Sequence, residues 1–500
     1  MQRMTGIDPM FIYSDTPETP MEIAYACLFD PSSLPGGYSF ERVTGVLETR
    51  IPTLPPFRRR LMPVPLGLDH PRWVDDPDFD LTNHLHRVAL PAPGGDAEFR
   101  AKVSQVMSRP LTPEQPPWEM YVVEGMAGGM IGLIAKVHHS VVDGVAGAEM
   151  LAKLLDLTPE GSAVTEPCPP WVPARLPSQT ELMTDALPSF LRSPLRGLAA
   201  AREVGRTAVR LARCALDDRL GPVSIPVGAP DTFESPVGAA RAVSFAELDM
   251  EDVRMLKARF GSTINDVVLA VCSGALRAHL SRHGQDVESP LVAVVPVSVR
   301  GDSDGAALGN HLSAMFVPLS NDQKTPLERL RTVTAASASC KGQERAVGYG
   351  PMATRLTEAV PPAVVKPMIQ LGVRSGVLRK VRAGNLMVSN VPGPDFPLYF
   401  AGMELRAVHP LGPVIDGVAL NITVQSYWDS LFVGVNACAS AVPDLPGLTD
   451  AMVDELSLLC RMAAGAGEPN PAARARLAAS GQSPAPTPGA VRRVGAPTPI

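Results

Sequence analysis

The chain has few cysteines and few charged residues. Its 500 residues contain seven scattered cysteines without a C-x-x-C pair, and charged residues make up 19%. This usage argues against a disulfide framework or a zinc knuckle and agrees with a reducing cytosol. The net charge of -6 argues against a general nucleic-acid binder. We therefore expect a cytoplasmic protein with no nucleic-acid partner.

Membrane and export segments are also missing from the sequence. No stretch approaches about 18 uncharged apolar residues, which a bilayer span requires. The opening "MQRMTGIDPMFIYSDTPETP" lacks the apolar core of a secretory signal. Any membrane contact is therefore expected to be peripheral.

The composition divides the chain into four parts. Residues 1–160 and 241–465 each mix strand-like and helical segments, which predicts a mixed α/β fold with two halves. Residues 161–240 are rich in Pro, Ser, Ala and Arg, and predict a linker around one helical block over about 195–217. Residues 466–500 predict a disordered tail.

Several local signals give sharper predictions. "SFERVTGVLETRI" predicts a helix that follows Ser39, and "STINDVVLAVCSGALRAHLSRHG" predicts a helix capped by Ser262 or Thr263, with Gly284 just past its end. The segments "VALNITVQS" and "LFVGVNACA" predict a hairpin. The run "MIGLIAKV" predicts a buried strand that ends at two adjacent histidines.

Those histidines, His138 and His139, open the stretch "HHSVVDG". Because adjacent strand residues point to opposite faces, a shared metal ion is disfavoured, and we expect no metal site. A neutral imidazole in a water-poor channel takes a proton from an alcohol at neutral pH. Asp143 either reaches the imidazole or turns away to fix the loop through an arginine, and Gly144 allows a tight turn. The residues alone predict an active-site loop, with packing as the alternative.

The same stretch matches the HHxxxDG signature of the CoA-dependent acyltransferase superfamily. From its N-terminus to about residue 460 the chain resembles the bacterial wax ester synthase/diacylglycerol acyltransferase family. The blocks that match in order are "DPMFIYSDTPETPMEI", "RPLTPEQPPWEMYVVEG", "NDVVLA", "SNVPGP" and "GVALNITVQSYWDSLFVGV". Peptide-synthetase condensation domains share the signature alone, whereas the blocks together are specific.

This resemblance implies two chloramphenicol-acetyltransferase-like subdomains, each a mixed sheet with helices, and a tunnel at their interface with His139 near its middle. It implies that His139 is the general base that deprotonates a diacylglycerol or a fatty alcohol. The alkoxide then attacks long-chain acyl-CoA directly, and acyl-CoA is a co-substrate, so no cofactor is expected. The sequence has no nucleophile motif such as G-x-S-x-G, which agrees with direct transfer.

The resemblance also implies supporting residues around the histidines. Asp143 is implied to be structural, and Arg58 and Arg60 in "FRRRLM" are the candidate partners. His138 either supports His139 or packs behind it.

Two further motifs leave alternatives open. Asn265 and Asp266 match the family's Asn-Asp motif, which favours a role for Asn265 across the cleft from His139 as an oxyanion donor; a helix cap is the alternative. Trp118 follows Pro116-Pro117, where the family has Pro-Leu-Trp, and is either a motif residue or a core residue. Proline at 117 removes a backbone N–H and an apolar side chain.

The helical block between the halves carries a basic face. A helical wheel places four arginines on one narrow arc with apolar residues roughly opposite. The arginines are Arg202, Arg206, Arg210 and Arg213, and the apolar residues are Val204, Ala208, Leu211 and Ala215. The helix packs on its own protein with a solvated basic face, docks on an anionic membrane or a lipid droplet, or meets the CoA phosphates.

Two other functions stay open beside acyl-CoA-dependent transfer. Acyl transfer from a carrier-protein thioester predicts a carrier domain or a docking patch. A non-catalytic lipid-binding protein has no physical need to keep His139, Asp143 and Asn265 together.

Overall fold

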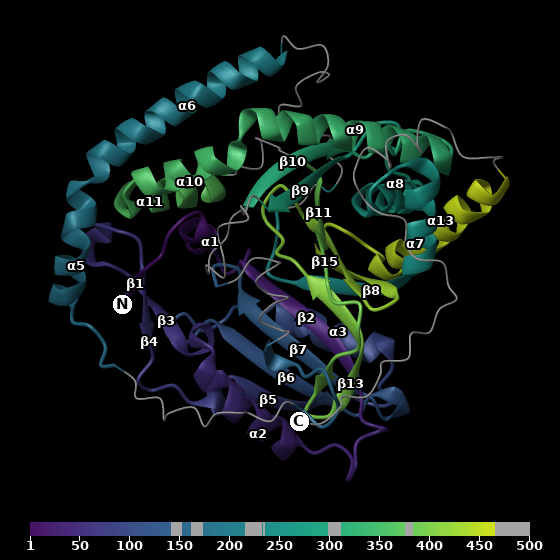
Figure 1. The fold of residues 1–500 in the computed structure, drawn as a ribbon, viewed down its shortest axis with the longest axis horizontal. Helices are drawn as coiled ribbons and strands as arrows, with labels where there is room; N and C mark the ends of the chain where they lie inside the picture. Colours follow the sequence, from purple (N-terminus) through teal and green to yellow (C-terminus); the bar gives the residue numbers. More distant parts are fainter. Residues whose placement is uncertain are drawn as a thin grey trace, which may run out of the picture.

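The computed structural model describes residues 1–141, 153–161, 174–215, 233, 236–298, 312–375 and 384–465. Two six-stranded sheets and a three-stranded sheet of order β1-β4-β3 make up its β-structure. The N-terminal sheet has the order β12-β13-β2-β7-β6-β5, and the C-terminal sheet has the order β10-β9-β11-β14-β15-β8 (Figure 1). Both large sheets combine parallel and antiparallel pairs, which confirms the predicted mixed α/β class.

The strand bounds follow the chain order. The strands are β1 Gln2–Arg3, β2 Glu22–Asp30, β3 Arg59–Met62, β4 Arg72–Asp75, β5 Leu85–Ala89, β6 Trp118–Glu124, β7 Ile131–His138, β8 Arg241–Asp249, β9 Val292–Ser298, β10 Leu312–Pro318, β11 Leu386–Val391, β12 Tyr399–Phe400, β13 Met403–Leu411, β14 Leu420–Tyr427 and β15 Ser430–Cys438.

The helices of the described residues lie around these sheets (Figure 1). The α-helices are α1 Asp8–Ser14, α2 Phe40–Arg50, α3 Asp96–Met107, α5 Gln179–Leu191, α6 Ser193–Ala215, α7 Met250–Phe260, α8 Ile264–Arg282, α9 Pro326–Val347, α10 Tyr349–Ala359, α11 Pro362–Arg374 and α13 Leu445–Gly465. The short 3₁₀ turns are η1 Ile51–Thr53, η2 Pro55–Arg58, η3 Pro65–Gly67, η4 Leu81–Asn83 and η5 Ala127–Gly129.

Local signals predicted their elements well. Ser39 accepts a hydrogen bond from the Arg42 amide at the start of α2, and Thr263 caps α8. Gly284, with φ of 65°, follows the end of α8. Strands β14 and β15 form the predicted antiparallel hairpin. Each of these predictions is confirmed, because a cap or a tight turn is specified by residues close together in the sequence.

Strand β2 shows how the N-terminal sheet is packed on both sides. Its alternate residues Ala24 and Ala26 pack with Phe99 of α3, whereas Tyr25 and Cys27 belong to the apolar cluster that includes helix α2. This alternation follows from the two-residue period of a strand. Helix α3 also contacts β8, so it connects the two large sheets.

The chain order does not separate the two halves. Strands β12 and β13 come from the part predicted to form the C-terminal half, yet they belong to the N-terminal sheet. Strand β13 pairs antiparallel with β2, from Glu404 opposite Asp30 to Leu411 opposite Ala24. The simple division at 160 and 241 therefore needs this correction. An apolar pattern reports burial but not the partner strand, so the sequence did not predict the exchange.

In its described residues, the predicted linker contains two helices, α5 and α6, where one helical block was predicted. Helix α6 buries Ala200, Glu203 and Thr207, whereas Val204 is 40% exposed and Ala208 is exposed. The prediction that Val204 and Ala208 form the packed face is therefore wrong.

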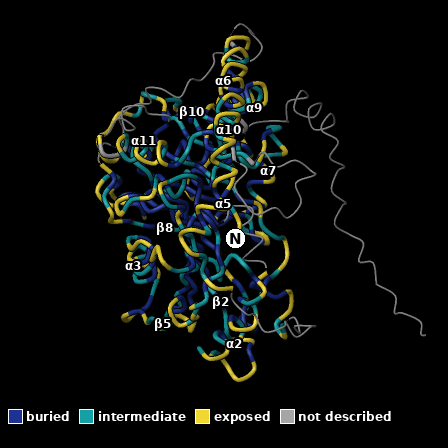
Figure 2. The backbone as a smooth tube through the Cα atoms, turned by 90° about the vertical axis from the view of Figure 1, so that its left-hand side faces the viewer, coloured by how far each residue is buried: buried dark blue, intermediate teal, exposed yellow. Residues whose placement is uncertain are grey.

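The reason is an ion-pair cluster around Glu203. Its carboxylate lies 3.2 Å from Arg210, 3.6 Å from Arg206 and 3.1 Å from Arg355 of α10. These pairs turn the Glu203 side of α6 toward α10 and the opposite side toward solvent (Figure 2).

Among the described helices, none combines the length and the apolarity that a bilayer span needs. Asp143, Gly144 and the predicted tail at 466–500 lie outside the described residues.

Candidate active site

His139 lies in the turn that directly follows β7. Its backbone N–H donates to the Met21 carbonyl at 2.8 Å, just before β2 begins. Its ring stacks on Phe11 of α1, with ring centroids 4.3 Å apart and an interplanar angle of 8°. The imidazole orientation is thus set by α1 and by the entry to β2.

This imidazole faces a cavity between the two large sheets. The empty volume, including the part that is open to solvent, is about 1000 Å³. The N-terminal sheet and the segment after β13 contribute Ile23, Ala24, Tyr25, His139, Pro410, Leu411, Gly412 and Pro413, and the C-terminal sheet with its adjoining loop contributes Pro296, Met387, Ser389, Asn390, Val391, Pro392, Asn421 and Thr423. His139 therefore lies at the interface of the halves, where the resemblance implied a tunnel.

The segment after β13 is fastened to the C-terminal sheet. The Asn421 amide donates to the Pro413 carbonyl at 3.0 Å, and the Asn436 amide donates to the Gly412 carbonyl at 2.8 Å. A Cβ atom on Gly412 would stand 2.4 Å from Asn421 Nδ2, so only glycine fits this approach. Sequence analysis missed these cavity residues, although the block "GVALNITVQ" contains Asn421 and Thr423.

His138 points to the opposite face of the sheet and is buried. Its Nδ1 accepts the Ser140 backbone N–H at 3.1 Å, and the Ser140 hydroxyl lies 2.8 Å from the same atom. Because Nδ1 is an acceptor, the neutral ring carries its proton on Nε2. These bonds join the residues on either side of His139. This favours the interpretation in which His138 supports His139.

Asp15 directly follows α1 and contacts both His138 and Met21, the residue whose carbonyl accepts the His139 N–H. Its Oδ1 accepts the Met21 N–H at 3.0 Å, and its Oδ2 lies 3.6 Å from His138 Nε2. Met21 in turn holds the His139 backbone. Sequence analysis missed Asp15 and Phe11, although both lie in the matched block "DPMFIYSD".

A buried ion pair lies on the His138 side of the sheet. Lys136 Nζ is 2.6 Å from Glu22 Oε2, and both side chains are almost fully buried. Glu22 is the register partner of His138 and also accepts the Leu111 N–H at 2.6 Å. Burial raises the pKa of Glu22, and the Lys136 charge opposes that rise.

Trp118 is a core residue of the N-terminal half. Its indole N–H donates to the Phe57 carbonyl at 2.6 Å, and its ring stacks on His84 with centroids 4.6 Å apart. It does not line the cavity. The preceding Pro117 accepts the His138 N–H at 3.0 Å, so proline in place of leucine keeps the acceptor that this strand end uses.

The two candidate arginines have other partners. Arg60 Nη1 lies 3.7 Å from Asp76 Oδ1 and donates to the Glu114 carbonyl at 3.1 Å, and Arg58 donates to the Pro52 carbonyl. Because Asp143 lies outside the described residues, its pairing with either arginine stays a prediction.

Asn265 and Asp266 form the first turn of α8. Asp266 Oδ2 accepts the Thr263 N–H at 2.8 Å, and Thr263 Oγ1 accepts the Asp266 N–H at 3.2 Å, a reciprocal capping box. Asn265 is half-buried and does not line the cavity that His139 faces. The described residues thus do not bring Asn265 to His139, and its oxyanion role stays a prediction.

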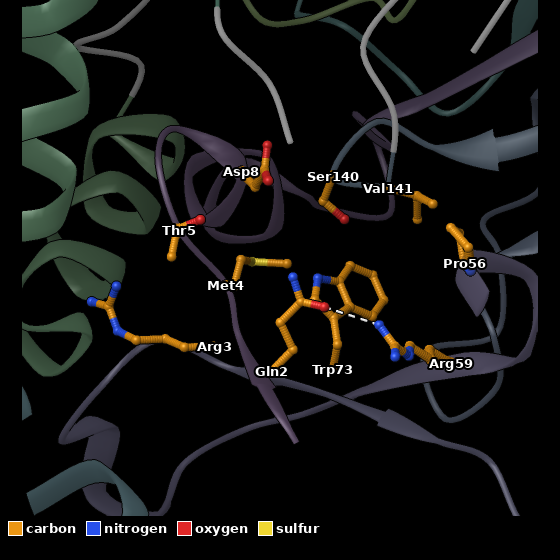
Figure 3. Close-up of a pocket in the computed structure, with 10 residues that line it drawn as sticks. All are labelled: Gln2, Arg3, Met4, Thr5, Asp8, Pro56, Arg59, Trp73, Ser140 and Val141. Atoms are coloured by element: carbon orange, nitrogen blue, oxygen red, sulfur yellow. Dashed lines mark hydrogen bonds between the residues drawn. The ribbon is translucent and has the colours of Figure 1, made fainter. Parts of the chain in front are cut away.

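A second cavity lies beside the turn after His139 (Figure 3). Its empty volume is about 450 Å³, and Ser140, Val141, Trp73, Gln2 and Arg59 are among its lining residues. Figure 3 shows Arg59 directed at Gln2, whose Oε1 accepts its guanidinium at 2.9 Å. The part of the chain that the structure describes holds no group of three or more candidate metal ligands.

The N-terminal sheet includes β13 from the C-terminal part of the chain, which we call the exchanged strand. Two mixed sheets with this exchanged strand and a histidine between them define the two-lobed acyltransferase class of fold. The starter condensation domain of rhizomide synthetase shares this fold, with a TM-score of 0.55 at 16% identity over 94% of this chain and 95% of that one. The wax ester synthase/diacylglycerol acyltransferase from Marinobacter aquaeolei aligns with a TM-score of 0.64 at 26% identity, over 93% of this chain and all of that one.

The chain belongs to the wax ester synthase/diacylglycerol acyltransferase family. Residues 4–268 match the catalytic domain of that family, and residues 308–459 match its C-terminal domain. A candidate diacylglycerol O-acyltransferase of Mycobacterium tuberculosis is 38% identical over 92% of this chain and 90% of its own length. The O-acyltransferase WSD of Acinetobacter baylyi is 31% identical over 92% of this chain and 97% of its own.

Proposed function

We propose that the protein transfers a fatty acyl group from long-chain acyl-CoA to the hydroxyl of a diacylglycerol, and also of a fatty alcohol. One observation carries this proposal: His139 faces a cavity of about 1000 Å³ between the two halves of a chain that belongs to this family. The two apolar substrates must meet in one space beside the base. Such a space also keeps water away from the thioester, which water would hydrolyse.

The proposed chemistry runs in a ternary complex. His139 takes the hydroxyl proton, and the oxygen attacks the thioester carbonyl. The carbon–sulfur bond then breaks, and the imidazolium returns its proton to the departing CoA thiolate. His139 Nδ1 is buried, which supports Nε2 as the nitrogen that meets the substrate. The step uses acyl-CoA as co-substrate and requires no further cofactor.

The protein is proposed to act in the cytoplasm, in peripheral contact with a membrane or lipid droplet. Its acceptor and its product are insoluble in water, so the enzyme must meet a lipid phase. The exposed arginines of α6 support such a contact.

The test uses radiolabelled acyl-CoA with diacylglycerol, hexadecanol or water, and compares the wild type with His139→Gln. We expect labelled ester with the lipid acceptors and a loss of about 10²- to 10⁴-fold in kcat for the variant. His283→Gln, at an exposed histidine of the other half, is the matched control and should leave kcat unchanged. Failure to acylate either lipid, or full turnover by a folded His139→Gln, would refute the proposal.

A further inference from the structure

Among the described residues, six large apolar side chains of the η3 turn, the α5–α6 junction and α11 are strongly exposed on one side of the molecule. Their exposed fractions lie between 50% and 78%, and they are Leu66, Leu191, Leu195, Val364, Met368 and Leu371. We call these six residues the apolar face. A surface helix normally turns such residues toward the core, so an exposed set requires an explanation.

Helix α11 shows most clearly that apolar residues face solvent instead of the core. Val364, Met368 and Leu371 are spaced i, i+4 and i+7, which places them on one stripe of the helix. All three are exposed, whereas Pro362 at the helix start is buried. The apolar stripe of α11 therefore faces solvent.

The members of the apolar face belong to one surface. Both α5 and α11 contact the η3 turn, and a Cβ atom on Gly67 would stand 2.8 Å from the Ala363 nitrogen. Leu66, in that turn, has φ of 59°, a left-handed conformation that costs energy for leucine. Figure 1 shows α5, α6, α10 and α11 at the left and upper left of the molecule.

The charge around the apolar face is opposite to that of the whole chain. The protein has a net charge of -6, yet residues 186–215 contain six arginines and one acidic residue, and Asp185 just before them is paired with Arg72. That acid, Glu203, is buried among its arginine partners. Arg192 between α5 and α6, Arg202 on α6 and Lys366 on α11 are exposed. A basic rim around apolar side chains is complementary to anionic headgroups above acyl chains.

The apolar face also connects to the candidate active site. Helix α11 contacts α1, and α1 carries Phe11, whose ring stacks on His139. A lipid layer on this face would therefore lie on the side of the molecule from which α1 reaches the imidazole.

We propose that the apolar face docks the protein on an anionic phospholipid bilayer, an inference that rests on the proposed function because that function supplies the need for a lipid phase. The leucine and methionine side chains enter the acyl region, and Arg192, Arg202 and Lys366 contact the phosphates.

The experiment measures flotation of the full chain with phosphatidylcholine vesicles, with and without about one-third phosphatidylglycerol. Leu195→Glu/Met368→Glu is compared with Met255→Glu/Val453→Glu, a control at two apolar positions on α7 and α13 that are 37% and 41% exposed. We expect the first variant to lower the vesicle partition coefficient by at least about tenfold and the control to leave it unchanged. Arg192→Gln/Arg202→Gln/Lys366→Gln should remove the extra binding to anionic vesicles.

Equal binding by the first variant and the wild type would overturn the proposal. A dimer in the absence of vesicles that only the first variant dissociates would also overturn it, because a second copy would then cover the face. Acylation of hexanol from decanoyl-CoA without vesicles is measured in parallel and should be unchanged in all variants. If the wild type does not acylate hexanol, the proposed function is refuted. The docking proposal is not affected by that result, because vesicle binding is measured separately.

Discussion

Each half of the protein contains a buried ion pair, but the two pairs occupy different places. Glu22 and Lys136 lie in the N-terminal sheet, in register with His138. Arg329 and Glu455 lie 2.6 Å apart between helices α9 and α13 of the C-terminal half. The comparison indicates that the Glu22–Lys136 pair of the N-terminal half lies beside the histidine turn. The C-terminal half uses its pair to join helices and provides one wall of the cavity.

The largest expected effect comes from breaking one pair in each half. Lys136→Met and Arg329→Met should each cost about 3–5 kcal/mol of unfolding free energy, because each leaves a buried carboxylate without its cation. Only Lys136→Met should also lower kcat per folded molecule, since Glu22 is the register partner of His138. Urea unfolding and active-site-normalised turnover measure the two effects. An equal loss of kcat in Arg329→Met would remove the distinction between the halves.

A second test uses pH at the contact between the halves. His409, on the exchanged strand β13, stacks on Phe245 of β8 and lies 3.1 Å from the Val433 carbonyl of β15. Burial lowers the pKa of His409 to about 4. In the unfolded chain the pKa of this imidazole is about 6.5, so between pH 6.5 and pH 4 the unfolded chain binds a proton that the folded chain does not. The contribution of neutral His409 to the unfolding free energy is therefore fully present above pH 6.5 and declines as the pH falls toward 4.

The expected loss from this one residue is about 3 kcal/mol over that window. His409→Gln should flatten the decline by that amount, as measured by urea midpoints at pH 7.5 and pH 4.5. The control His283→Gln changes an exposed histidine and should alter the pH dependence much less, through its neighbour His279 alone. An unaltered slope in His409→Gln would show that the contact between the halves does not sense protons through this imidazole.

The smallest effect is expected at Asp15. Asp15→Ala removes the acceptor for the Met21 N–H and should lower kcat by about tenfold to a hundredfold, because a misplaced base loses near-attack geometry. Asp15→Asn keeps an acceptor oxygen and should recover most of the loss. Asp249 caps α7 in the other half, so Asp249→Ala is the matched control and should change stability without changing kcat. No rescue by asparagine would count against a positioning role.

Short-range signals explain which parts of the fold could be predicted. Ser39 and Thr263 cap helices through bonds to residues three positions away, and the β14–β15 turn joins neighbouring strands. His139 could be singled out as a candidate because its motif is contiguous in the sequence. The exchange of β13 and the packed face of α6 depend on partners far away in the sequence. Asp15 acts through a backbone amide, which no residue pattern records.

The exchanged strand β13 has a consequence for synthesis of the protein. Strand β2 leaves the ribosome early, but its neighbour β13 is among the last strands to be made. Until then the β2 edge has unpaired amides and carbonyls, and such edges recruit other strands and promote aggregation. A nascent chain that stops before residue 399 therefore lacks the strand that closes this edge, and we expect such fragments to need chaperone protection.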